Sequence, residues 1–242
     1  MPGHAPAIAL VLAGGLGTRM GRTKQFLEIG GKPALYHTLK AFEEADHVGG
    51  IYAVGDGPRV EALARVTGIS KYVRCGEAGT FRQLSTKSGL LLCDEDPETV
   101  VLVHDGSRPL VTPALIGRVV EAALADDRPD GVVPATRVSD TVKVEKNGEV
   151  AETLDRTQLR AVQTPQAFRL GYLRRLHEAT DEYLGAATDD ASLVELEGGR
   201  VVLVEGEKTN IKLTTPEDLI FAEAILAARG RDPMRGFARE RR

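Results

Sequence analysis

The stretch IALVLAGGLGTRMGRTK (residues 8–24) joins an apolar run to a glycine-rich loop and a group of cations. Residues 8–12 are continuously apolar, which predicts a buried strand. The loop AGGLG (residues 13–17) follows, and its glycines let backbone N–H groups approach a ligand closely. Such groups at the start of a helix favour an anion, and Arg19 and Lys24 lie just behind them. The stretch therefore predicts a polyphosphate site, although a plain strand-to-turn connection with surface charges is the alternative.

Two absences argue against a dinucleotide-binding turn. Gly15 and Gly17 begin such a fingerprint, but Met20 stands where its third glycine belongs. An acidic residue is also expected about 20 positions on, whereas the next strand-like run ends only near Asp56. The loop has no Gly-Lys-Ser/Thr ending of the Walker type either. We therefore expect a nucleotide site of a third kind.

The composition is that of an ordinary globular α/β protein. The chain has 242 residues, of which 42% are apolar and 27% charged. This length suits one domain, which we place at residues 7–229. The net charge of −4 indicates no basic surface for a nucleic acid or a membrane. Local arginines and lysines must then hold any anionic substrate.

The cysteines and the chain ends bear on the cellular compartment. Cys75 and Cys93 lack metal-site spacing and predict free, buried thiols in a reducing compartment. The sequence shows neither a signal-peptide pattern nor a run of about 18 apolar residues. We expect a cytoplasmic protein without membrane segments. Residues 1–6 and 230–242 are predicted to be disordered ends.

Strand-like and helix-like segments alternate along the first half of the chain. This alternation predicts a doubly wound, mostly parallel sheet. Ligands of such sheets bind outside the carboxyl ends of the strands, where the glycine loop and Asp105 both fall. The expected strands are 8–12, 50–54, 71–74 and 99–103, and the expected helices are 33–45, 59–66, 80–92 and 113–125.

The pattern changes after residue 131, where a β-hairpin is predicted. Two alternating segments, 142–146 and 149–153, flank Asn147-Gly148, whose residues both accept a positive φ. An isolated hairpin is marginally stable, so this one needs a packing partner. It is either a flap on its own domain or an arm, at about residues 139–156, that reaches a second subunit. The remaining expected elements are 159–163, helices near 170–178 and 189–196, strand 200–204 and a last helix from 216.

Several blocks of sequence together carry a family resemblance. AGGLGTRM with TKQFLEIGGKP is similar to nucleotidyltransferases that activate sugars and polyols. Over about residues 7–229 the chain resembles the IspD family of 2-C-methyl-D-erythritol 4-phosphate cytidylyltransferases, and closely similar ribitol-5-phosphate cytidylyltransferases share most of the blocks. The resemblance implies a Rossmann-like nucleotidyltransferase fold. The other blocks, in order, are GEAGTFRQLSTKSGL, VLVHDGSRPLV, SDTVK, LDRTQLRAVQTPQAF, TDDAS and TNIKLTTPEDL.

The resemblance implies transfer of a cytidylyl group. A phosphomonoester oxygen of the acceptor attacks the α-phosphorus of CTP, and pyrophosphate leaves. Because the nucleophile is already ionised near neutral pH, fixed cations and Mg²⁺ matter more than a strong base. The acceptor, methylerythritol phosphate or ribitol phosphate, stays open. Thr209 replaces an acidic residue of some relatives, and the AGG loop replaces AAG. The alternative to an enzyme is a catalytically silent subunit that only binds a nucleotide.

The resemblance also implies roles for single residues. The catalytic cations are Arg19, Lys24 and Lys212, although Lys212 alternates with apolar neighbours and could be a strand residue facing water. Ser85 could equally be a helix cap. The nucleotide would bind Ala13, Gly14, Gly15, Gly17, Gly79, Thr80 and Ser85.

The acceptor residues complete the expected site. They are Asp105, Arg108, Thr141, Arg156, Thr164 and Thr188. Asp105 is also the best oxygen ligand for Mg²⁺. His104 is expected to be structural. The resemblance implies a homodimer in which the hairpin arm brings Thr141 and Arg156 to the partner's site.

Overall fold

A computed structural model describes residues 7–15, 24–179 and 181–230. Its centre is an eight-stranded sheet in the order β5–β4–β1–β6–β11–β7, and β7 pairs further with β10 and β12. Gly17, Arg19 and the terminal segments 1–6 and 231–242 lie outside the described residues, while Gly230 ends the last helix. The strands are β1 Ala7–Leu12, β4 Val48–Val54, β5 Tyr72–Gly76, β6 Val100–Asp105, β7 Gly131–Arg137, β10 Arg160–Val162, β11 Gln166–Arg169 and β12 Val201–Glu205.

The predicted mostly parallel sheet is confirmed, with two strands, β7 and β11, that the sequence did not indicate. β1 runs parallel to β4 and β6, β4 to β5, and β7 to β12. β11 is inserted antiparallel between β6 and β7. β11 has only four residues and leads directly into α5. It is therefore too short to show the apolar–polar alternation by which a strand is predicted.

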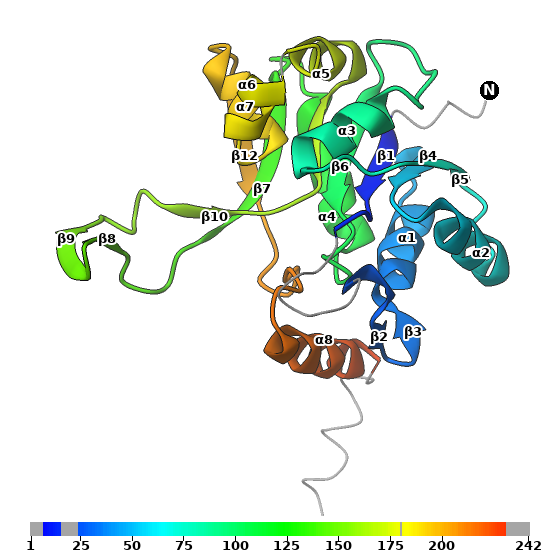
Figure 1. The fold of residues 1–242 in the computed structure, drawn as a ribbon, viewed down its shortest axis with the longest axis horizontal. Coiled ribbons are helices and arrows are strands. Elements are labelled where there is room, and N and C mark those ends of the chain that lie inside the picture. The colour runs from blue at the N-terminus through cyan, green and yellow to red at the C-terminus, as the bar shows by residue number, and fades with distance from the viewer. Residues whose placement is uncertain (1–6, 16–23, 180, 231–242) are drawn as a thin grey trace, which may run out of the picture.

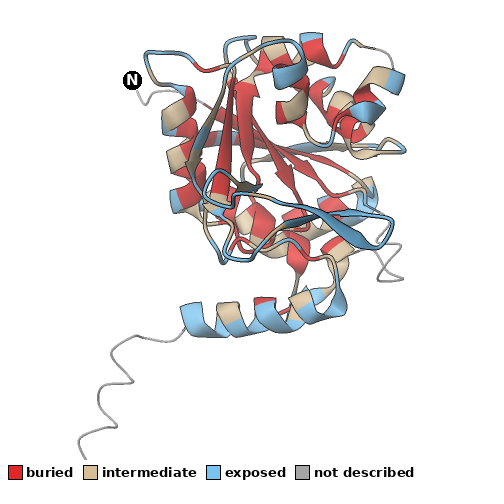
Figure 2. Cartoon of the chain, turned by 90° about the vertical axis from the view of Figure 1, so that its left-hand side faces the viewer, coloured by how far each residue is buried: buried red, intermediate tan, exposed pale blue. Residues whose placement is uncertain are grey.

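Helices cover both faces of the sheet. The alternation along β1 explains this arrangement: Ala9 and Val11 pack in the cluster with α1, α2 and α4, whereas Leu10 and Leu12 pack in the cluster with α3, α5 and α7. Figure 2 shows the buried strands between these layers. The helices are α1 Ala34–Glu44, α2 Gly57–Thr67, α3 Arg82–Leu90, α4 Pro113–Ala123, α5 Leu170–Leu176, α6 Asp181–Ala186, α7 Asp190–Leu196 and α8 Pro216–Arg229.

The helix boundaries predicted from the sequence are confirmed only in part. Thr112 caps α4 by accepting a hydrogen bond from the Leu115 backbone at 3.1 Å, as predicted. Pro33 precedes α1 instead of opening it, and α3 begins at Arg82, two residues later than expected. The short helix α6 was not predicted. None of the helices in the described part of the chain has the length and apolar character of a membrane span.

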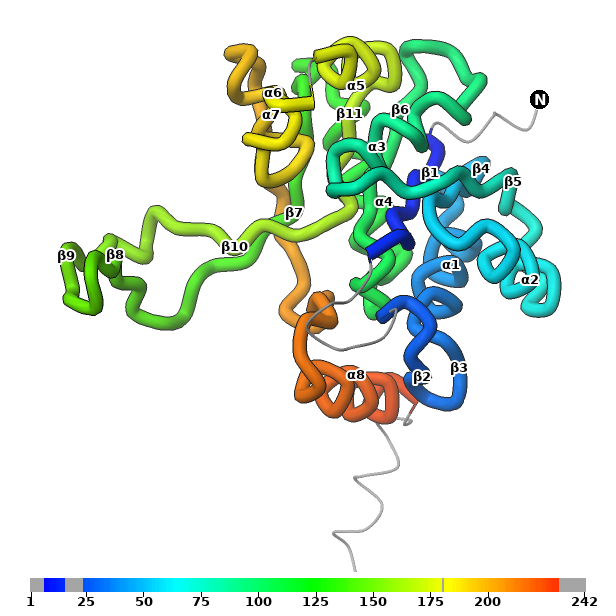
Figure 3. The backbone as a smooth tube through the Cα atoms, in the orientation of Figure 1, coloured from blue at the N-terminus to red at the C-terminus, as the bar shows by residue number. Residues whose placement is uncertain are grey.

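The predicted hairpin consists of β8 Lys143–Lys146 and β9 Glu149–Thr153, which pair antiparallel. Asn147 and Gly148 form its turn with φ values of 56° and 84°. Every residue of both strands is exposed, including Val150 at 63%. The chain leaves the sheet along β7 and returns along β10, so the hairpin projects away from the body (Figures 1 and 3).

A small third cluster supports the lower side of the molecule in Figure 1. It joins the two-residue strands β2 Glu28–Ile29 and β3 Lys32–Pro33 to α8 through Ile29, Leu213 and Ala222. The 3-10 helix Lys24–Phe26 directly precedes β2. The cluster therefore fixes the segment that follows Lys24 and the segment around Lys212.

Candidate active site

A cleft of about 600 Å³ opens at the carboxyl ends of β1 and β6. It brings together most residues that the sequence singled out for the nucleotide and the phosphates, from four separate segments of the chain. This is the edge at which parallel α/β sheets bind ligands. Its lining residues are Leu12, Gly14, Gly15, Lys24, Gln25, Ala78, Gly79, Thr80, Phe81, Arg82, Ser85, Asp105, Ser107 and Lys212.

Close backbone packing explains two glycines of this cleft. A Cβ on Gly14 would lie 2.1 Å from the Ala78 Cβ, and one on Gly79 would lie 2.7 Å from the backbone carbon of Leu84. The Gly79 N–H donates to the Ser85 hydroxyl at 3.1 Å. Ser85 therefore ties the turn before α3 and does not cap the helix, whose N-cap is Phe81. Ala13 is buried beneath the loop.

Asp105, at the end of β6, is the charge centre of the cleft. Its Oδ1 accepts from the Arg82 Nε at 3.1 Å, and its Oδ2 pairs with the Lys212 Nζ at 2.7 Å. Burial by itself raises the pKa of this carboxyl, but the charges of Arg82 and Lys212 outweigh burial and hold the pKa well below its usual range. Asp105 is therefore an anion held by two cations.

Both lysines expected to act on phosphates are described. Lys24 donates to the carbonyls of Leu213 and Thr214 at 3.3 and 3.4 Å, so it is tied to the segment that carries Lys212. Lys212 lies in an irregular segment after β12, not in a strand, and its side chain is 43% exposed. The alternative of a water-facing strand residue is therefore wrong, because Lys212 faces Asp105 across the cleft.

Arg108 and Thr164 support this region from behind. Arg108 donates to the carbonyl of buried Asn210 at 2.8 Å. The Thr164 hydroxyl accepts from the Asp105 backbone N–H at 3.1 Å and lies 3.1 Å from the His104 Nδ1. Thr164 is buried and is not a lining residue of the cleft, so the structure makes it a support for Asp105.

His104 is structural, as expected, and fully buried. Burial disfavours the imidazolium and lowers its pKa from 6.5 to about 4.

The lowered pKa of His104 predicts that stability depends on pH. As the pH falls from about 6.5 to about 4, the unfolded chain takes up a proton that the folded chain does not. The folded state should thus lose up to about 3 kcal/mol of stability over this range. In urea titrations His104→Gln should flatten that dependence, and an equal slope in the variant would contradict the assignment. His47→Gln, at a partly exposed position, is the control.

Three expected acceptor residues are not brought to this cleft. Thr141 and Arg156 flank the hairpin and are exposed, and Arg156 donates to the Ser139 carbonyl at 2.5 Å. Thr188 is exposed just before α7. Their roles therefore depend on a second subunit or on movement of the chain.

Sequence reasoning missed Arg82 and Asp190. Arg82 directly follows the predicted nucleotide turn in the block GTFRQ, and a cation beside such a turn is a usable signal. Asp190 resembled an ordinary acidic residue at a helix start, yet it is fully buried against Arg82. Only the tertiary structure, in which the first residues of α3 and α7 meet in this ion pair, places the two together.

The carboxylates of the cleft decide whether the site could hold Mg²⁺. In the described part of the chain, no three His, Cys, Asp or Glu side chains gather closely enough to hold a metal ion. Mg²⁺, however, is often held by one or two carboxylates together with substrate phosphates. Asp105 supplies one carboxylate in the cleft that Lys24 and Lys212 also line, so the residues fit that arrangement.

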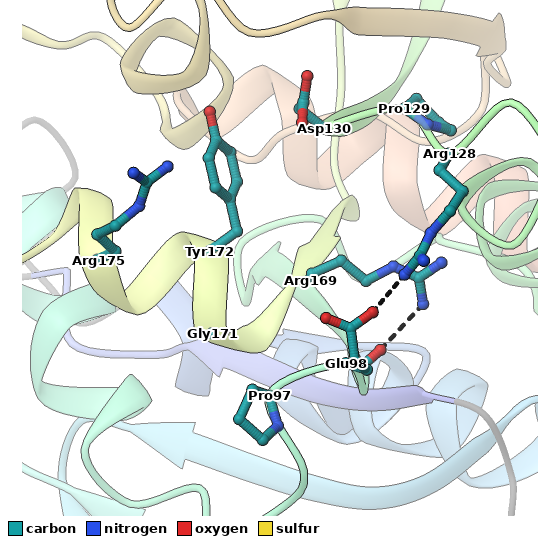
Figure 4. Close-up of a pocket in the computed structure, with 9 residues that line it drawn as sticks. All are labelled: Pro97, Glu98, Arg128, Pro129, Asp130, Arg169, Gly171, Tyr172 and Arg175. Carbon is teal, nitrogen blue, oxygen red and sulfur yellow. Dashed lines mark hydrogen bonds and ion pairs between the residues drawn. The ribbon is translucent and has the colours of Figure 1, made fainter.

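A second hollow, of about 530 Å³, lies near the amino ends of β6 and β7 (Figure 4). Arg128 pairs there with Glu98, and Arg169 donates to the Glu98 carbonyl at 2.9 Å. Arg175 lies over the Tyr172 ring. Because this hollow lies at the amino ends of its strands and no glycine loop borders it, it suits a nucleotide less well than the cleft at Asp105.

Comparisons with known proteins agree with this geometry. The family model described as IspD, 2-C-methyl-D-erythritol 4-phosphate cytidylyltransferase, matches residues 7–228. A relative of that name from Rubrobacter xylanophilus is 61% identical over 93% of this chain and 96% of its own length. Another, from Geobacillus kaustophilus, is 46% identical over 91% and 97%.

Solved structures extend the likeness to the fold. The 4-diphosphocytidyl-2C-methyl-D-erythritol synthase of Anaerococcus prevotii has a TM-score of 0.76 and 32% identity, covering 91% of this chain and 96% of its own. The 2-C-methyl-D-erythritol 4-phosphate cytidylyltransferase of Thermus thermophilus has a TM-score of 0.74 and 33% identity, covering 91% and 99%. With a family match over nearly its whole length and a cleft where that fold binds ligands, the chain belongs to the IspD family.

Proposed function

We propose that this chain transfers a cytidylyl group from CTP to 2-C-methyl-D-erythritol 4-phosphate and releases pyrophosphate. The observation that carries the proposal is the convergence of the glycine loop, Lys24, Lys212 and Asp105 on one cleft. Relatives that match almost the full chain bear the name of that activity. The alternative acceptor, ribitol 5-phosphate, has no comparable support.

The chemistry needs charge stabilisation more than a strong base. The acceptor phosphate is anionic near neutral pH, so the difficulty is to bring it in line with the triphosphate and to hold the developing charge. Lys24, together with Arg19, would neutralise the leaving pyrophosphate. Lys212 would transfer its contact from Asp105 to the α-phosphoryl oxygens, which its exposed side chain permits.

Asp105 and Arg108 would orient the acceptor. Once Lys212 engages the phosphate, the Oδ2 of Asp105 becomes available to a hydroxyl group or to Mg²⁺, while its Oδ1 stays with Arg82. Bound Mg²⁺ would neutralise the triphosphate and polarise its oxygens. The side chains themselves would bind both substrates, orient the acceptor and neutralise the phosphate charges.

The direct test follows pyrophosphate release from CTP and Mg²⁺ with each candidate acceptor. Methylerythritol 4-phosphate should be turned over and ribitol 5-phosphate much more slowly. The reverse order would establish the alternative acceptor. No pyrophosphate with either acceptor, together with calorimetric binding of CTP, would establish the catalytically silent nucleotide-binding protein.

CTP is expected to be preferred over UTP, ATP and GTP. Backbone groups of the turn at Gly79, which lines the cleft, would face the base edge, where a narrow site excludes purines by size. Ala13, which the sequence also assigned to the nucleotide, is buried and does not line the cleft. A site that hydrogen-bonds an exocyclic amine leaves a polar group unpaired with uracil, so kcat/KM should fall at least about 10²-fold for UTP. Competition of the four nucleotides in the pyrophosphate assay measures this, and comparable values for UTP and CTP would refute it.

The assembly and the compartment are part of the same proposal. A homodimer in which each arm contacts the other subunit would cover the exposed hairpin. A cytoplasmic location is supported by the two cysteines, both of which are free thiols. Cys93 is buried as predicted, whereas Cys75, at the edge strand β5, is only partly buried.

A further inference from the structure

Arg82 links two carboxylates that come from distant parts of the chain. Its Nε donates to the Asp105 Oδ1 at 3.1 Å, and its Nη1 donates to the Asp190 Oδ2 at 2.5 Å. Asp105 ends β6, whereas Asp190 begins α7. A planar guanidinium can hold both carboxylates at once in a fixed relative orientation, which a lysine ammonium cannot do.

The far side of this bridge is anchored in the core. Asp190 is fully buried, and its Oδ1 lies 3.0 Å from the Nε2 of His177, which is itself buried. The side chain of Arg82 is 21% exposed and that of Asp105 11%. The bridge thus runs from a fixed interior anion to the carboxylate that pairs with the Lys212 ammonium.

Stability alone does not account for such an arrangement. Buried ion pairs often stabilise a fold no better than apolar residues of similar volume, because desolvation offsets the attraction. Here the ions connect the interior to the cleft. The bridge also starts at the first residue of α3, directly after the turn of Gly79 and Thr80.

We propose that Arg82 is a positioning residue for cytidylyl transfer, which holds the Oδ1 of Asp105 against the Asp190 anchor so that its Oδ2 faces the acceptor and Lys212. The inference rests on the proposed function. Arg82 acts through Asp105, because its Nε and Nη1 are both donated to carboxylates. It keeps the Asp105 carboxylate in place when Lys212 leaves it for a phosphate.

The test compares Arg82→Gln and Arg82→Lys with the native enzyme. Arg82→Gln should lower kcat/KM for the polyol phosphate about 10²-fold, the effect of misplacing a reacting group by about 1 Å. Arg82→Lys should recover little of this loss. A lysine keeps the positive charge but lacks the planar guanidinium that donates to both carboxylates at once. The KM for CTP should change less than about threefold, whereas a general loss of folding would affect both substrates. Arg74→Gln, in an exposed ion pair with Asp94, is the matched control.

Two double variants separate positioning from folding. Arg82→Gln with Asp190→Asn removes the buried charge that Arg82 no longer neutralises, and thermal melting should show recovered stability while the acceptor defect persists. Arg82→Gln added to Asp105→Asn should cost less than about threefold beyond Asp105→Asn alone, because the two residues act in series. Recovered activity in the first, or multiplied losses in the second, would overturn the proposal. If the native protein releases no pyrophosphate, the proposed function fails instead.

Discussion

Lys212→Ala is expected to lower kcat at least about 10²-fold while the fold stays intact, as when one preorganised charge stabiliser is removed. The Lys212 Nζ lies 2.7 Å from Asp105, at the cleft edge where the α-phosphoryl group would lie. Its side chain is 43% exposed, so little packing is lost on truncation. The loss should fall on kcat more than on the KM for CTP, because the contact strengthens as charge develops in the transition state.

Lys24→Ala should show a loss of similar size. Because Lys24 also donates to the carbonyls of Leu213 and Thr214, circular dichroism and thermal melting must accompany the kinetics. Lys40→Ala is the matched control, since this exposed lysine pairs only with Glu44 on α1 among the described residues. Near-native turnover in either cleft variant would mean that the phosphates bind elsewhere.

Removal of the hairpin is the second change with a large expected effect. Replacing residues 142–153 by a Gly-Gly turn should give monomers in sedimentation and a much higher KM for the polyol phosphate. The hairpin has no core of its own, since every residue of β8 and β9 is exposed. CTP binding should change little, because the glycine loop follows β1. In the sheet, β11 and β6 separate β1 from β7, the strand that leads to the hairpin.

Mixing two inactive proteins tests whether the sites are shared. Arg156 is exposed and donates to the Ser139 carbonyl, and its planar fork suits a phosphate of another subunit. Arg156→Ala and Lys212→Ala subunits, dissociated and reassociated, should regain one site with both native residues. Each variant reassociated with itself is the control. Verified heterodimers without recovered activity would show that Arg156 serves its own subunit or has no catalytic part.

Local patterns predicted much of the framework. The apolar run before the glycine loop became β1, buried on both faces, and Thr112 with Pro113 marked the start of α4. Asn147-Gly148 gave the hairpin turn. Such signals are readable because they depend on neighbours in the chain: side-chain alternation, capping and positive φ.

The sequence by itself determined the strand β1 and the positions of the glycines and lysines from which we propose a phosphate site at the carboxyl ends of the strands. Only the tertiary structure decided that β11 enters the sheet antiparallel, and that Arg82 reaches from α3 to Asp105 and Asp190. The bridge joins residues up to 108 positions apart. No local period records such a contact, because the contact exists only once α3, β6 and α7 have packed around the same buried charges.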